Sequence, residues 1–191
     1  MSRTIYFTAA TINGFIADEQ GSLEWLTTIE PSAATDDPAT GDAKGEPPAH
    51  VAFIEQIGVL VEGSTTYQWC LDHGETDFTG GRFPTFVFTS RSLPAAAGAD
   101  VRFRSGNVRD SYDEIRAAAD GKDIWLVGGG DLAGQFFYDA GLLDELQISI
   151  APVALTGGAP LLPRSIDSST LSLREVSRFD HFAHLIYHVT R

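Results

Sequence analysis

The sequence contains 191 residues, 43% of them apolar, with a formal net charge of −13 and a single cysteine, Cys70. The negative charge argues against nucleic acid or an anionic membrane as the main partner. No apolar run approaches the roughly 20 residues that a membrane-spanning helix needs, and the N-terminus runs directly into a strand pattern rather than a signal peptide. A lone cysteine excludes an internal disulfide and suits a reducing cytoplasm. We expect one cytoplasmic domain, residues 1–191, that acts on a small molecule.

The N-terminal segment predicts a central strand over residues 3–10, followed by a break at Gly14. Small and apolar residues then continue to Gly21, where Ser22 is placed to cap a short helical turn. Trp25 lies in that turn, and it either fills the core or lines a pocket for a flat ring.

Residues 30–48 show no apolar periodicity and carry five acidic groups against one lysine. A stretch of this length is long for a loop in a compact domain, so it is either a mobile lid or a disordered insertion. We favour a flexible loop.

The middle of the chain alternates helix and strand patterns. A helix is expected from Ala49 to Ile57 and a buried strand from Ile57 to Val61. Gly63 and Ser64 then open a second helix with Ser64 as its cap, which makes a weak candidate phosphate contact.

A third strand over residues 85–89 ends in Thr89-Ser90-Arg91. These are donors at a strand's carboxyl end, where open α/β sheets bind ligands. Another short strand follows over residues 101–104, and the Ser111-x-x-Glu114 pattern indicates a capping box at the start of a helix.

The stretch from Ile124 to Asp131 combines a buried strand, three glycines and the start of an amphipathic helix with Leu132, Phe136 and Phe137 inward. Glycine allows close backbone approach, and the unpaired N–H groups and dipole of a helix start favour phosphate. The plainer alternative is a tight turn without a ligand. Asp131 is explained by the dipole as well as by a ribose contact.

The glycines also match the dinucleotide pattern G-x-G-x-x-A of a Rossmann unit. Only 61 residues follow Gly130, however, and the acidic residue expected about 20 positions later is absent from Ile148–Ala151. A Rossmann domain is therefore disfavoured.

The C-terminal part predicts a strand ending at Ala151 and a hairpin over residues 171–178 and 182–190. Asp144 and Glu145 are expected at the surface start of a strand, and the three late histidines at an edge rather than at a metal. The alternation of strands and helices followed by a hairpin indicates an α/β fold, mostly parallel with an antiparallel edge.

The order and spacing of several motifs resemble the dihydrofolate reductase superfamily. The resemblance is strongest to the reductase domain of bacterial bifunctional riboflavin-biosynthesis deaminase-reductases and its stand-alone relatives. The motifs are Asn13–Ala17, Gly21-Ser22-x-x-Trp25-Leu26, Gly63-x-x-Thr66-Tyr67, Val87–Ser90, Val127–Gly130, Gly141–Leu146, and Ala151-Pro152 through Gly158-x-Pro160-Leu161.

The resemblance implies a three-layer α/β/α fold and a homodimeric reductase that takes hydride from NADPH. In such proteins the glycine turn holds the pyrophosphate, with a cis peptide between Gly128 and Gly129. The family often carries an arginine where this chain has Ser64, so Arg91 is the remaining candidate partner for the 2′-phosphate. The implied cofactor residues are Ala10, Ala17, Gly63, Ser64, Thr66, Thr89, Ser90, Arg91, Val127, Gly128, Gly129, Gly130, Asp131 and Leu132.

For catalysis, Trp25 is expected to flank the nicotinamide and the substrate. Glu55 is nearest in position to the family's buried carboxylate, Asp18 and Glu24 compete as proton sources, and water can also serve. The substrate is expected to be a small heterocycle, imine or carbonyl compound, as in reduction of the phosphoribosylamino-uracil intermediate of riboflavin synthesis or of dihydrofolate. The alternative is a catalytically silent protein that binds a nucleotide or pterin.

Overall fold

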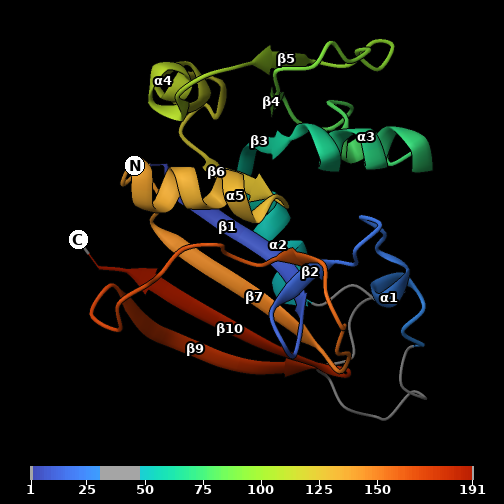
Figure 1. The fold of residues 1–191 in the computed structure, drawn as a ribbon. Helices are drawn as coiled ribbons and strands as arrows, with labels where there is room; N and C mark the ends of the chain where they lie inside the picture. Colours follow the sequence, from blue (N-terminus) through green and yellow to red (C-terminus); the bar gives the residue numbers. More distant parts are fainter. Residues whose placement is uncertain (1, 31–47, 191) are drawn as a thin grey trace.

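The computed structural model describes residues 2–30 and 48–190. Eight strands form one sheet in the order β5-β4-β3-β6-β1-β7-β10-β9. In Figure 1 this order runs from β5 at the top to β9 at the bottom. All neighbours from β5 to β7 are parallel, whereas β10 runs antiparallel to both β7 and β9. The strands are β1 (Thr4–Thr11), β3 (Ile57–Gly63), β4 (Thr85–Phe88), β5 (Val101–Arg104), β6 (Asp123–Val127), β7 (Glu145–Ala151), β9 (Leu171–Phe179) and β10 (Phe182–Val189).

Two short strands, β2 (Phe15–Ala17) and β8 (Ala159–Pro160), form a separate antiparallel pair. They carry the chain over the carboxyl ends of the central strands, where Figure 1 shows β2 beside the end of β1. The helices are α1 (Glu24–Thr27), α2 (Pro48–Gln56), α3 (Ser64–His73), η1 (Thr76–Phe78), α4 (Val108–Ala118), α5 (Gly130–Gly134) and its π-helical continuation η2 (Gln135–Asp139). None of the described helices is long and apolar enough to cross a membrane.

The two faces of the sheet bury separate cores because side chains alternate along each strand. On one face, Val61 and Leu126 pack with Ile115 of α4 and Phe136 of η2. On the other face, Leu60 and Trp125 pack with Phe53 of α2. These layers confirm the predicted α/β architecture with an antiparallel edge.

The predicted elements are present, with boundaries that shift where local capping differs. Helix α4 begins at Val108 rather than at Ser111, because the Asn107 side chain accepts the Arg109 N–H at 2.9 Å and caps the helix. The predicted capping box is therefore wrong: Ser111 is buried inside α4, and Glu114 pairs with Arg104 of β5.

Two further capping predictions need correction. Gly63, not Ser64, is the N-cap residue of α3, and no side chain of the described residues caps that helix. Ser22 accepts the Glu24 N–H at 3.1 Å, but the cap position of α1 is Leu23. The predicted flexible loop over residues 30–48 falls almost wholly outside the described residues, as does the side chain of Phe137.

Glu145 was expected at the surface and is instead buried at the start of β7. Its side chain is covered by Arg3 and by Gln147, both of which hydrogen-bond to its carboxylate. Arg3 compensates the buried charge, with its guanidinium 3.2 Å from Glu145. The neighbouring Asp144 carboxylate accepts the Thr4 N–H at 2.8 Å and so fixes the start of β1.

Candidate functional site

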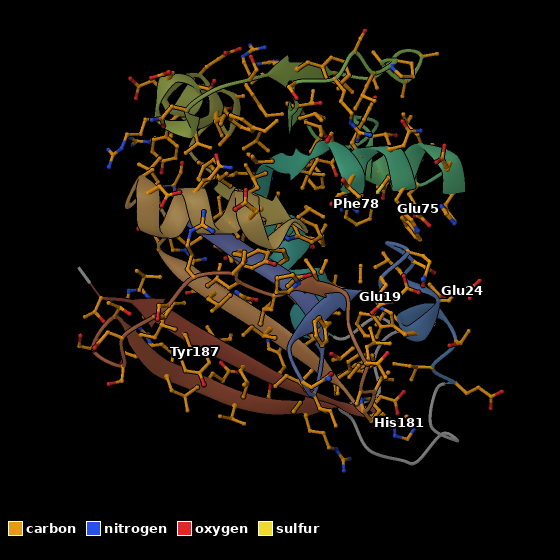
Figure 2. All side chains as sticks on the ribbon, in the orientation of Figure 1. Glu19, Glu24, Glu75, Phe78, His181 and Tyr187 are labelled. Atoms are coloured by element: carbon orange, nitrogen blue, oxygen red, sulfur yellow. The ribbon has the colours of Figure 1, made fainter. Side chains whose placement is uncertain are left out.

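A cavity of about 1430 Å³ lies at the carboxyl edge of the parallel strands and continues over the face that carries α2. Residues of α3 and η1 form one side, and the loop from β2 to α1 forms the other. In the view of Figure 2, Glu75 and Phe78 mark the first side and Glu19 and Glu24 the second. The floor comes from β1, β6, β7 and β10. We refer to this space as the cleft.

The glycine turn after β6 lines the cleft, as the sequence predicts for a phosphate site. Gly128 and Gly129 have φ angles of 61° and 74°, in the left-handed region that glycine adopts without strain. Gly130 is required for a different reason, because a Cβ there would overlap the carbonyl oxygens of Pro160 and Leu161. The turn then leads into α5, whose first N–H groups have no acceptor within the helix.

The cis peptide expected between Gly128 and Gly129 is not found, since no peptide bond among the described residues is cis. Two successive left-handed glycines make the reversal with a trans bond instead. This expectation from the resemblance is therefore wrong for the structure.

The start of α3 packs directly against the glycine turn on the same side of the cleft. Thr65 and Thr66 line the cleft, whereas Ser64 does not. The Thr66 hydroxyl oxygen would lie 2.7 Å from a Cβ built on Gly128. Thr66 and the glycine turn thus form one continuous wall.

The third predicted phosphate contact lies beyond the cleft wall. Thr89, Ser90 and Arg91 follow β4 at the same edge of the sheet, two strands from the glycine turn, or about 10 Å at the usual strand spacing. The Thr89 hydroxyl accepts the Arg91 N–H at 2.9 Å, which closes this turn locally. Arg91 itself is exposed.

The N-terminal candidates divide between cleft and scaffold. Ala17 lines the cleft, but Ala10 is buried in the opposite core, and Ala9 faces the cleft in its place. Leu132, like Ala10, is a buried core residue. Gly63 is the N-cap residue of α3.

None of the proposed catalytic residues lines the cleft. The Asp18 carboxylate accepts the N–H groups of Gln20 and Ser22 at 2.9 and 2.7 Å, so it holds the loop before α1. The Trp25 indole N–H is buried and has no acceptor among the residues described. Glu55 is exposed on α2, and its carbonyl oxygen accepts from Lys122.

Residues that the sequence analysis did not single out form the floor of the cleft. Phe7 of β1, Gln147 and Ser149 of β7, and His184 of β10 all line it. A signal was present: Glu145, Gln147 and Ser149 alternate with Leu146 and Ile148, so β7 has a polar face although it is an interior strand.

One buried acid lies close behind the cleft wall. Glu62 of β3 is fully buried, and neither carboxylate oxygen has a partner among the described residues. It pairs in register with Val127, which lines the cleft. Burial raises the pKa of Glu62 to about 9, so this carboxyl is neutral at pH 7.

Cysteine and histidine are the other reactive side-chain types near the cleft or on its strands. Burial raises the pKa of the Cys70 thiol to about 12, which makes it a poor nucleophile. His184 shares a hydrogen bond of 3.0 Å with the Ser149 hydroxyl, and His181 lies 3.6 Å from Asp180. No group of three or more metal-ligating side chains occurs within residues 2–30 and 48–190.

Comparison with known proteins places this geometry in a family. The family model described as RibD C-terminal domain matches residues 59–185. The uncharacterised protein YwjB of Bacillus subtilis is 24% identical over 191 residues, or 97% of each chain.

Solved structures similar to this chain support the same assignment. The crystal structure of a protein from Shewanella sp. PV-4 that is named for riboflavin biosynthesis has a TM-score of 0.74 and 25% identity over 99% of each chain. Dihydrofolate reductase of Enterococcus faecalis, solved with NADP(H), has a TM-score of 0.57 and 18% identity, covering 99% of this chain and 97% of that one, and it supports the fold alone. This chain therefore belongs to the RibD C-terminal domain family and has the fold of dihydrofolate reductase.

Proposed function

We propose that this protein is an NADPH-dependent reductase that delivers hydride to a C=N or C=O carbon of a small heterocyclic or imine substrate. The observation that carries the proposal is the Gly128–Gly130 turn, which opens onto the cleft at the carboxyl edge of a parallel sheet beside the start of α3. Ligands of open α/β sheets bind at this edge.

The residues present suit a dinucleotide. The left-handed Gly128 and Gly129 expose bare backbone to the cleft, and a Cβ on Gly129 would find only Leu132 within 4 Å. Backbone N–H groups there and the Thr66 hydroxyl would hold the diphosphate. When bound, the nicotinamide supplies the hydride, while the chain's own residues orient the two rings.

Arg91 supports NADPH over NADH. Its guanidinium is exposed and makes no ion pair with any described acid, so it is available for the extra phosphate of NADPH. Its place two strands from the glycine turn suits a group at the far end of the dinucleotide.

The proton is best supplied by water. The predicted donors Asp18, Glu24 and Glu55 do not line the cleft, and of the acids that do, Glu145 and Asp131 are held by Arg3 and Arg164. Catalysis then depends on holding the substrate carbon against the nicotinamide rather than on a dedicated acid.

The test is titration of the full chain with NADPH and, separately, NADH, followed by tryptophan fluorescence and thermal unfolding. Micromolar NADPH should quench fluorescence and raise Tm, with weaker effects of NADH and a smaller preference in Arg91→Met. Absence of any response to either cofactor at millimolar concentration would overturn the proposal.

A catalytically silent nucleotide- or pterin-binding protein is the second candidate, because no predicted proton donor lines the cleft. NADPH consumption with dihydrofolate or with the phosphoribosylamino-uracil intermediate decides between the two. Turnover with either substrate excludes the silent protein.

We also propose a homodimer. The outer edge of β9 pairs with no described strand, and Leu173 and Val176 on this strand are 52% and 62% exposed. Long exposed edge strands with apolar side chains are prone to pair with another chain.

A further inference from the structure

Arg164 stands out because it joins the loop after β8 to the helix that follows the glycine turn. Its guanidinium donates to the carboxylates of Asp131 and Asp139, at 3.1 and 3.2 Å. A Cβ on Gly134 would lie 2.9 Å from the Arg164 Cζ atom, so the guanidinium rests on the backbone of α5. Both acids are exposed, but the Arg164 side chain is only 24% exposed. Packing therefore holds these ion pairs in place together with charge.

The loop that carries Arg164 is fixed by the rest of the fold. The Leu161 carbonyl accepts the Tyr6 hydroxyl at 3.0 Å, and the Leu161 N–H donates to the Gly14 carbonyl at 2.8 Å. A Cβ on Gly130 would lie 2.6 Å from the Leu161 carbonyl oxygen. The loop thus contacts β1, the turn between β1 and β2, and the glycine turn, and these contacts set the position of Arg164 beside α5.

Asp131 directly follows the glycine turn. It is the second residue of α5, whose N-cap is Gly129, and it lines the cleft. Its Oδ1 accepts from Arg164, and its Oδ2 accepts at 3.1 Å from Gln135, one turn later on the same side of the helix. No side chain of the described residues caps α5. The two donors therefore hold the carboxylate beside the helix, and the first N–H groups of α5 receive no side-chain acceptor from the described chain.

The charge of Asp131 opposes the ligand that we place at this turn. An acid in the first turn of a helix lies in the same favourable field that attracts a bound phosphate. The diphosphate of a dinucleotide is a dianion, so its repulsion from Asp131 weakens binding, and the formal charge of −13 on the chain adds to this effect. A cation beside Asp131 offsets this repulsion.

The other arginines that line the cleft lie farther from the glycine turn. Arg174 and Arg178 are on β9, four strands from β6, or roughly 19 Å at the usual strand spacing. Arg3 precedes β1 at the opposite edge of the parallel strands, where it binds two buried acids. Within the described part of the chain, Arg164 is thus the arginine that the fold brings to the acid beside the turn.

We propose that Arg164 is a positioning residue of the cofactor site: it neutralises Asp131 and holds that carboxylate beside the helix, so that the glycine turn can bind a diphosphate. The inference rests on the proposed reductase function and deepens it, because Arg164 does not itself line the cleft. Asp139, the last residue of η2, is bound by the same guanidinium but does not line the cleft. It therefore provides a matched comparison with Asp131.

The test measures calorimetric binding of ADP-ribose, which has the diphosphate of NADPH but no nicotinamide, to the full chain at low salt. Arg164→Met should weaken binding about fivefold, as expected for one uncompensated like charge near the surface. Adding Asp131→Asn to Arg164→Met should restore the affinity to within about twofold of the wild-type value, whereas adding Asp139→Asn should not. High salt should reduce the loss in Arg164→Met, because salt screens exposed charges.

Single variants keep the test decisive if Arg164→Met folds poorly. Asp131→Asn should tighten ADP-ribose binding about threefold, since it removes a negative charge and keeps Arg164. Asp139→Asn should leave the affinity unchanged, and Arg164→Lys, which retains the positive charge, should lose less affinity than Arg164→Met. A role for Arg164 limited to stability would lower Tm in the variants without changing their affinities for ADP-ribose.

Equal affinities of the wild-type protein and Asp131→Asn would overturn the inference, as would recovery of Arg164→Met binding by Asp139→Asn. Absence of ADP-ribose binding to the wild-type protein at millimolar concentration would overturn it as well. If ADP-ribose bound with the expected pattern but NADPH did not bind, the reductase proposal would fail and the role of Arg164 would stand. NADPH binding that is indifferent to Arg164→Met would overturn only the role of Arg164.

Discussion

The side chain of Thr66 packs against Gly128 so closely that a Cβ on the glycine would lie 2.7 Å from the threonine hydroxyl oxygen and 3.2 Å from its methyl carbon. Gly128 also has a φ of 61°. Two independent constraints, the backbone conformation and the packing of Thr66 against this residue, thus demand glycine at the point where we place the diphosphate.

Gly128→Ala should therefore weaken NADPH binding by tenfold or more and lower the free energy of unfolding by about 1–2 kcal/mol, the usual cost of a left-handed residue with a Cβ. Fluorescence titration and urea denaturation measure the two effects. Gly141→Ala is the matched control: its φ is also 61°, but a Cβ there meets nothing within 4 Å. It should lose only the part of this stability that comes from the backbone conformation, and it should keep wild-type affinity. Equal affinity losses in both variants would contradict a cofactor role for the turn.

The Gly128 turn shows what sequence reasoning can reach. Three adjacent glycines between a buried strand and a helix pattern predict a close-approach turn, and the parallel sheet with its final hairpin follows from the order of apolar segments. The helix starts at Val108 and Ser64 were less predictable, because several polar residues near each start can serve as caps, and tertiary packing selects among them.

The catalytic side of the cleft was predicted less well. Asp18 and Glu55 have the right chemistry, but their side chains are used in a turn or exposed on α2. Gln147 carries no motif of its own. Its hydrogen-bond partner Glu145 is held by Arg3, which lies 142 positions before Glu145 in the sequence and meets it only in the folded sheet. Contacts between residues so far apart in the sequence leave no pattern in any one stretch of it.

Glu62 predicts an unusual dependence of stability on pH. Its folded-state pKa of about 9 exceeds the ordinary value of 4.5, so between these values the folded state holds a proton that the unfolded state has released. The free energy of unfolding should therefore fall as pH rises from 4.5 towards 9. At pH 7 this contribution is on the order of 3 kcal/mol.

Glu62→Met removes that titration and fills the same buried space. Urea denaturation should show the variant gaining stability over the wild-type protein from pH 5 to pH 8, with little difference near pH 4.5. Glu75→Met replaces an exposed acid and serves as the control. It should leave the slope of the unfolding free energy against pH as it is in the wild-type protein. Parallel pH profiles for the wild-type protein and Glu62→Met would show that the carboxyl is ionised in the folded state.

Arg3 links three strands, since it pairs with Asp123 of β6 and Glu145 of β7 while it precedes β1. Both acids are less than 10% exposed, and removing their cation leaves buried charge without compensation. Because Arg3 itself is 41% exposed, we expect Arg3→Met to cost about 2 kcal/mol, less than for a fully buried pair.

Thermal and urea unfolding test this cost, and Asp123→Asn in the Arg3→Met background should recover part of it. Arg82→Met removes an exposed pair with Asp77 at 3.7 Å and should cost under about 1 kcal/mol. If the Arg3 and Arg82 variants lost equal stability, the pairing of Arg3 with the two buried acids would contribute nothing beyond a surface contact.

The edge strand β9 gives the last prediction. If a second copy pairs along its outer edge, Val176→Lys places a charge in the interface and should convert the dimer to a monomer in light scattering at micromolar concentration. Ile12→Lys is a matched control, because Ile12 is similarly exposed, at 65%, but directly follows β1, which β7 and β10 separate from β9. Dimerisation should persist in the control, with unchanged Tm in both variants under dilute conditions. A wild-type chain that is monomeric at every concentration, or a Val176→Lys protein that remains dimeric, would exclude this edge as the interface.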